Sequence, residues 1–105
     1  MSGDYACEKF LLAVHGMAAS ARSIQERAGD AFVLHIMHVK DDDLPGDLSD
    51  LGAQLREYRE AWERQPGEGR IAKWANSLST DEASEVAMWI VKAYDRLSVA
   101  TRKIG

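Results

Sequence analysis

Two histidines and an aspartate come closest to a chemical site in this chain: His35, His38 and Asp42. On a helix, successive spacings of three and four positions place these side chains on one face, the narrow polar side of an otherwise apolar segment. Imidazole and carboxylate groups are ligands for zinc and other transition metals. A stable site needs a further ligand, which His15 supplies only if the first segment folds back. A metal- or small-ligand-binding bundle that uses His35 and His38 is therefore the alternative hypothesis.

The sequence shows no established pattern of catalytic residues. Cys7 and His15 are eight positions apart, which separates their Cα atoms by about 12 Å along a helix, too far for a thiolate and its base. No stretch matches a glycine-rich phosphate loop or the G-x-S-x-G nucleophile turn. No histidine follows a glutamate by three positions, as it does in di-iron helical bundles. We therefore expect a protein that is not an enzyme and uses no cofactor.

Apolar residues recur at spacings of three and four in segment after segment, which is the period of an amphipathic helix. Two stripes show it best: Leu48, Leu51, Leu55, Tyr58 and Trp62, and Val86, Ile90, Ala93, Leu97, Ala100 and Ile104. Each stripe has to be buried against another helix, and Leu55 should be fully buried. The predicted fold class is all-α, a compact bundle of four to five mostly antiparallel helices that forms one domain over residues 1–105.

Capping and turn residues indicate where the helices begin and end. The first segment is predicted to begin with Asp4 as its N-cap and to keep its apolar rhythm to residue 28, where Gly29-Asp30 ends or kinks it. A second main helix, capped by Asp47 or Ser49, should run to about residue 65, followed by a short helix over residues 70–78. Residues 79–82 match the S-x-x-E capping box, which predicts the start of the last helix.

Residues 31–39 form the ambiguous segment, because they are rich in strand-forming residues and short apolar runs do not separate a strand from a buried helix. No other segment alternates with a period of two, so a helix is the preferred interpretation. Pairing with a strand of another molecule is the alternative. As a helix, the segment is apolar around most of its circumference, which predicts deep burial between neighbours or in a dimer interface.

Charge is distributed unevenly along the chain. The formal net charge is −4, from 17 acidic and 13 basic residues, which disfavours nucleic acid as a partner. Five acidic residues fall within ten positions, Asp41, Asp42, Asp43, Asp47 and Asp50. The simpler interpretation is a solvated loop with helix N-caps. The alternative is an acidic surface around Asp41, Asp42 and Asp43 that binds a basic site on another protein.

The last helix has apolar residues on a second side. Met88, Trp89 and Val99 lie off the stripe formed by Val86 and Ile90 and continued by Ala93 and Leu97, so they are the predicted partner-binding residues. Together with residues 31–39 they offer more apolar surface than one small core needs. A homodimer is therefore expected.

The compartment and the class of function follow from what the sequence contains. It has no secretory signal, no apolar run of the ~20 residues that a membrane span requires, and a single cysteine, Cys7. We therefore expect a small cytoplasmic interaction or regulatory protein that binds a protein partner through helix faces and has no membrane association. Phage- or mobile-element-encoded inhibitors and immunity-type proteins share this physical type.

Overall fold

The computed structural model describes residues 3–102, and within this range it contains α-helices and short 3₁₀ turns but no strand. The α-helices are α1 (Asp4–Ala19), α2 (Ile24–Leu34), α3 (Ser49–Glu63), α4 (Arg70–Asn76) and α5 (Thr80–Arg102). Three 3₁₀ turns connect α2 to α3: Ile36–His38, Asp41–Asp43 and Gly46–Leu48. The predicted all-α bundle is confirmed. None of the described helices is long and apolar enough to cross a membrane.

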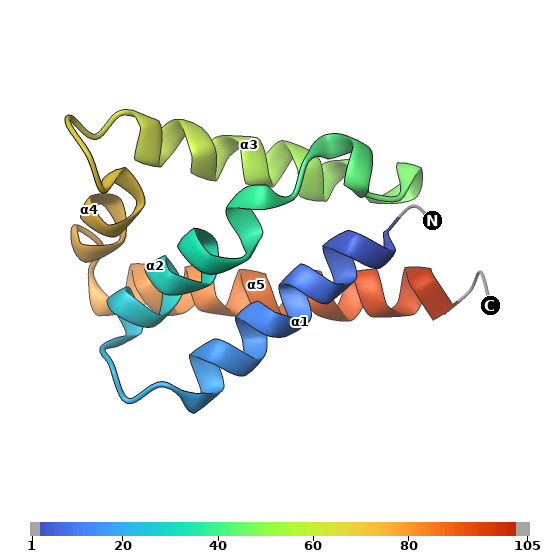
Figure 1. The fold of residues 1–105 in the computed structure, drawn as a ribbon, viewed down its shortest axis with the longest axis horizontal. Helices are drawn as coiled ribbons and strands as arrows, with labels where there is room; N and C mark the ends of the chain where they lie inside the picture. Colours follow the sequence, from blue (N-terminus) through green and yellow to red (C-terminus); the bar gives the residue numbers. More distant parts are fainter. Residues whose placement is uncertain (1–2, 103–105) are drawn as a thin grey trace.

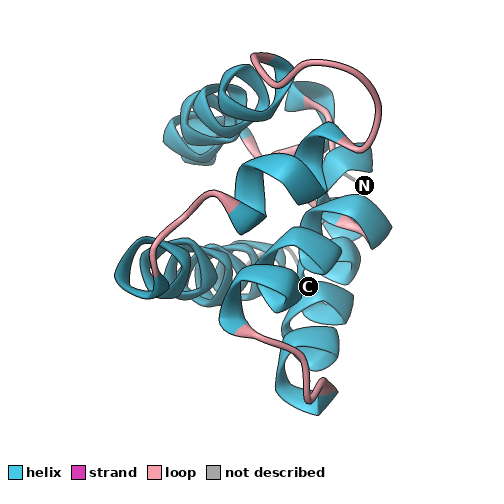
Figure 2. Cartoon of the chain, turned by 90° about the vertical axis from the view of Figure 1, so that its left-hand side faces the viewer, coloured by secondary structure: helices cyan, strands magenta, loops and turns pink. Residues whose placement is uncertain are grey.

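The long helices run in alternating directions (Figure 1). α1 packs against α5 in the opposite direction, and α2 turns back to contact α1, α4 and α5. α3 returns above them and leads into α4, the short helix that closes one end of the bundle. Figure 2 views the bundle from that end and shows loops joining all the helices.

The core is built around aromatic rings. Phe32 of α2 is fully buried, and its ring lies against Trp62 of α3, Trp74 of α4 and Trp89 of α5, with centroid distances of 5.3, 5.7 and 6.4 Å. Edge and offset contacts of this kind add to the free energy gained by burying apolar area. Leu55 is 1% exposed, so its predicted burial is confirmed. One aromatic side chain therefore joins three other helices to α2.

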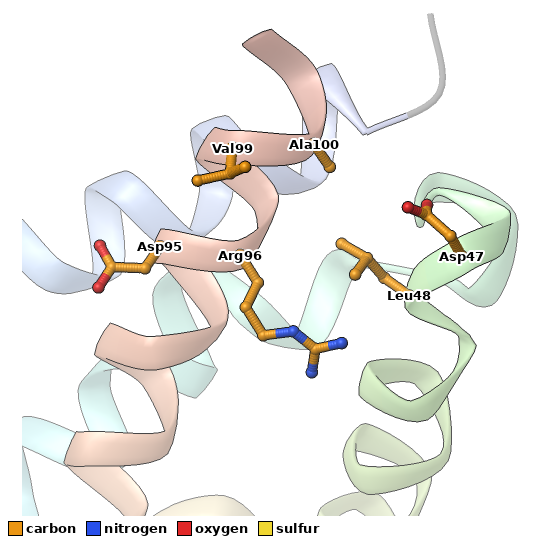
Figure 3. Close-up of a pocket in the computed structure, with 6 residues that line it drawn as sticks. All are labelled: Asp47, Leu48, Asp95, Arg96, Val99 and Ala100. Carbon is orange, nitrogen blue, oxygen red and sulfur yellow. The ribbon is translucent and has the colours of Figure 1, made fainter. Parts of the chain in front are cut away.

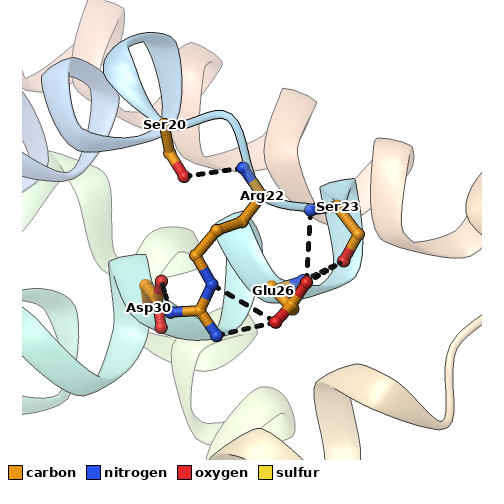
Figure 4. Close-up of polar contacts among 5 residues, drawn as sticks. All are labelled: Ser20, Arg22, Ser23, Glu26 and Asp30. Atoms are coloured by element: carbon orange, nitrogen blue, oxygen red, sulfur yellow. Dashed lines mark hydrogen bonds and ion pairs between the residues drawn. The ribbon is translucent and has the colours of Figure 1, made fainter.

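The first helical segment breaks earlier than predicted. α1 ends at Ala19, and α2 begins with a capping box in which Ser23 Oγ accepts from the backbone N–H of Glu26 and Glu26 Oε1 accepts from that of Ser23. Arg22 closes this corner by donating to Glu26 and Asp30, both at 2.8 Å (Figure 4). The capping box supplies partners for amides that a helix start leaves free. The expectation of a break at Gly29-Asp30 is wrong, because both residues lie inside α2.

The other predicted helix starts have mixed outcomes. The S-x-x-E box before α5 is confirmed, since Glu82 N donates to Ser79 Oγ at 3.0 Å and Ser79 N donates to Glu82 Oε1 at 2.8 Å. The cap of α3 is not confirmed, because Leu48 occupies the N-cap position and provides no side-chain bond. At the start of α1, Gly3 with φ of 96° is the N-cap and Asp4 lies in the first turn.

Of the glycines inside helices, Gly29 has the least room for a side chain, because α4 packs closely against α2 at this residue. A Cβ atom built on Gly29 would lie 3.0 Å from the Cβ of Ala75, whereas one on Gly16 of α1 would meet nothing within 4 Å. The two glycines therefore differ in packing and share the same low helix propensity.

We expect Gly16→Ala to stabilise the fold by up to about 1 kcal/mol, because alanine is the better helix former. Gly29→Ala has the same propensity gain, but its methyl group would press on α4. It should therefore be less stable than Gly16→Ala by about 1 kcal/mol or more. Urea unfolding of the two variants, followed by circular dichroism, measures the difference. Equal gains would show that α2 and α4 can move apart without cost.

Candidate partner-binding surface

One side of α5 is exposed and carries two large apolar side chains. Met88 and Val99 are 53% and 48% exposed. They lie on nearly the same face, because eleven residues are close to three helical turns. Lys92 and Asp95 lie between them, and both are exposed. The structure thus brings Met88 and Val99 together on one face, while their role in partner binding stays a prediction.

Met88 borders an apolar groove of about 280 Å³ where α1, the start of α2 and α5 meet. The lining residues come from all three helices: Val14, Met17, Ala18, Ile24, Arg27, Ser84, Ala87, Met88 and Val91. Arg27 crosses from α2 towards α1, where its Nη1 donates to the carbonyl oxygen of Met17 at 3.3 Å. Its Nε is buried and has no hydrogen-bond partner in the described part of the chain. Most of the side chains that line the groove are apolar, so it is suited to apolar contact.

Val99 borders a second hollow, of about 300 Å³, between α5 and the start of α3 (Figure 3). Arg96 reaches across it and donates two hydrogen bonds to the carboxylate of Asp50, at 2.6 and 2.9 Å. These bonds hold the pKa of Asp50 below its ordinary value and raise the pKa of Arg96. Arg96 therefore points towards α3, while the exposed side chains of Asp95 and Val99 border the same hollow from α5 (Figure 3).

The prediction that Trp89 lies on a partner-facing side of α5 is wrong. Its ring packs against Tyr58 and Phe10, with centroids 4.9 and 5.7 Å apart, and its Nε1 donates to Gln54 Oε1 at 2.6 Å. Tyr58 and Gln54 belong to α3, which therefore covers the side of α5 that a helical wheel leaves free. Trp89 is a half-buried packing residue.

The histidines do not lie on one helix face. α2 ends at Leu34, His35 is its C-cap with φ of −134°, and His38 ends the following 3₁₀ turn. Asp42 belongs to the next 3₁₀ turn. Residues 3–102 contain no group of three histidine, cysteine or acidic side chains placed to hold a metal ion. The spacing of His35, His38 and Asp42 thus fails as a metal site, because it presumed a helix that the chain does not form.

His35 is instead the partly buried C-cap of α2, and its imidazole has a perturbed pKa. Burial lowers its pKa below the ordinary value, and the nearby charges of Lys9 and His38 lower it further. The folded protein therefore favours the neutral ring.

Residues 31–39 are neither a strand nor wholly buried. Phe32, Ile36 and Val39 are fully buried, and Arg59 of α3 donates to the carbonyl oxygens of residues 37 and 39. In contrast, Val33, Leu34 and Met37 are 41%, 62% and 40% exposed. Burial of the whole segment between neighbouring helices, one of the two expected outcomes, is thus wrong, while burial in a dimer interface stays a prediction. We call these three exposed residues the α2-end patch.

The acidic segment is partly used to build its own loop. Asp41 pairs with Arg56 of α3 at 2.5 Å. Asp43 Oδ2 accepts from the Lys40 backbone N–H at 2.8 Å, and its carbonyl oxygen accepts from the Gly3 N–H at 3.1 Å. Asp42 is exposed. These contacts agree with the simpler interpretation, a structured and solvated loop, and binding of a basic partner by Asp41, Asp42 and Asp43 stays a prediction.

Taken together, the fold and surfaces define a small all-α bundle with exposed apolar side chains at the end of α2 and along α5. No protein-family model matches the chain, and comparisons with curated proteins and with solved structures give no match. To predict the α2-end patch from the sequence, one would first have to predict where α2 ends. No typical capping residue at positions 34–35 indicates that end.

Proposed function

We propose that this protein is a small, non-enzymatic interaction or regulatory protein that binds another protein through its helix faces and also forms a homodimer. The observation that carries the proposal is the α2-end patch. Three large apolar side chains are exposed within five consecutive residues, although the buried residues beside them already complete the core. These three residues are neighbours in sequence at one end of α2, and clustered exposed apolar groups mark interaction sites more often than isolated ones.

The physical type suits a protein that acts by occupying a surface of its target. A rigid bundle of 105 residues with few catalytic groups resembles, in size and charge, the inhibitors encoded by phages and mobile elements and the immunity-type proteins that cap a toxin. The analogy concerns physical type alone. The single cysteine, Cys7, is consistent with a reducing compartment such as the cytoplasm.

A photo-crosslinking amino acid at Leu34, expressed in cells of the source organism, tests the partner proposal. We expect a discrete crosslinked product from Leu34 and none from Glu63, an exposed control position at the end of α3. Changing Val33 and Met37 together to serine should abolish the product while shifting stability by no more than about 1 kcal/mol per site, because both side chains are exposed. Equal products from both positions, or none from Leu34, would contradict the proposal.

A further inference from the structure

The exposed side of α5 has a heptad pattern that is complementary to itself. Six residues at alternating spacings of three and four are all exposed: Glu85, Met88, Lys92, Asp95, Val99 and Arg102. Positions at this spacing form a continuous seam along one face of a helix. Two of the six side chains are apolar and four are charged, so pairing with a second helix depends on how the charges match. Over 18 residues at 1.5 Å each, this seam is about 27 Å long. We call it the α5 seam.

We propose that the α5 seam pairs with the α5 seam of a second copy of this chain, antiparallel and related by a two-fold axis between residues 93 and 94. This inference rests on the homodimer of the proposed function and names its interface. In an antiparallel pair, residue numbers that meet across the axis have a constant sum. With the axis placed here, Met88 meets Val99, Lys92 meets Asp95, and Glu85 meets Arg102.

Every one of these pairs is complementary. The two central pairs join opposite charges, the next two join apolar side chains, and the outer two again join opposite charges. A two-fold interface requires such self-complementarity, because each contact occurs twice. Within residues 3–102, neither Lys92 nor Asp95 takes part in an ion pair. Their charges are therefore available to a second chain.

Other arrangements of the same seam lose this match. A parallel pair would place Lys92 against Lys92 and Asp95 against Asp95, and like charges across an interface are unfavourable. An antiparallel pair shifted by one heptad would place Lys92 opposite either Met88 or Arg102. The charged residues thus select one direction and one register, as polar residues do in coiled coils.

The neighbouring helices leave the seam accessible. Arg96 turns towards α3 to bind Asp50, whereas Asp95 points to the other side of α5 (Figure 3). Val99 borders the hollow beside residues 47–48 but is 48% exposed, so a second chain can reach it. Towards the other end, Met88 borders the groove formed with α1 and α2, so a partner's Val99 would meet an apolar surface there. The α2-end patch lies on a different helix, so each chain of the dimer can still present it to another protein.

Charge exchange tests the pairing. Lys92→Glu places a carboxylate opposite the partner's Asp95, and Asp95→Lys places an ammonium opposite the partner's Lys92, each twice per dimer. We expect each variant alone to dissociate about ten-fold more readily than the wild type, or more. A one-to-one mixture should form a heterodimer with an affinity close to that of the wild type, because both central pairs are then again opposite in charge.

The double variant, Lys92→Glu with Asp95→Lys, is the matched control, since it exchanges both charges and should dimerise. Both substituted positions, 92 and 95, are exposed, so circular dichroism should show unchanged helix content. Sedimentation equilibrium measures the masses. A wild type that stays at 11.7 kDa up to about 200 µM would overturn both this pairing and the proposed homodimer. A wild-type dimer with single variants that still dimerise, or a mixture that does not recover, would overturn the α5 pairing alone.

Discussion

Replacing Phe32 with alanine should cost about 3–5 kcal/mol of the free energy of unfolding. The side chain is fully buried, and its ring contacts aromatic rings of α3, α4 and α5. Removing it leaves a cavity where three helices meet α2, and the remaining large rings cannot close it without shifting those helices. Small domains are stable by only about 5–15 kcal/mol, so this change removes a large share of the total.

Val33→Ala is the control for Phe32, because Val33 is the next residue in the same helix and is 41% exposed. It should cost about 1 kcal/mol or less, since truncation there opens no cavity. Urea unfolding followed by circular dichroism measures both variants on one scale. If Val33→Ala lowered the free energy of unfolding as much as Phe32→Ala or more, the face of α2 that carries Val33 would be the buried one.

Trp89→Ala should cost a similar amount, about 3–5 kcal/mol, although the residue is only half-buried. The substitution removes contacts with Tyr58 and Phe10 and takes away the donor that binds Gln54. It therefore weakens the attachment of α3 to α5. The interface interpretation of Trp89 predicts instead a stable, helical monomer.

Met88→Ala separates the two interpretations of this part of α5. Met88 precedes Trp89 and is 53% exposed, so in dilute, monomeric protein its truncation should shift stability by no more than about 0.5 kcal/mol. If Trp89→Ala left the unfolding midpoint unchanged while Met88→Ala lowered it strongly, the side of α5 that carries Met88, and not the side that carries Trp89, would pack on the core.

Much of the fold could be predicted because the determining signals are local. The stripe through Leu55 and the capping box at Ser79 and Glu82 lie within a few turns of one helix. The missed capping box at Ser23 and Glu26 has the same S-x-x-E pattern. The break is hard to recognise from the sequence, because the apolar residues on either side of it, Met17 and Ile24, keep the spacing of one continuous helix.

The surface was harder to predict because exposure depends on how separate helices pack. Trp89 lies off the main stripe of α5, and only the position of α3 shows that it is covered. The end of α2 at Leu34 likewise has no local signal. The position of this helix end determines which residues after it are exposed, among them Met37. It also determines that His35 and His38 do not lie on one helix face. The exposure of Met88 and Val99 could be predicted, because nothing within residues 3–102 covers these two side chains.

The mass of a one-to-one mixture of Lys92→Glu and Asp95→Lys proteins tests the central claim, self-association through the α5 seam, most directly. At a concentration close to the wild-type dissociation constant, sedimentation equilibrium of each variant alone should give a mass near that of one chain, 11.7 kDa. The mixture at the same total concentration should match the higher average mass of the wild type. A mixture no heavier than its separate components, beside a wild type that does dimerise, would show that the two copies meet through a different face.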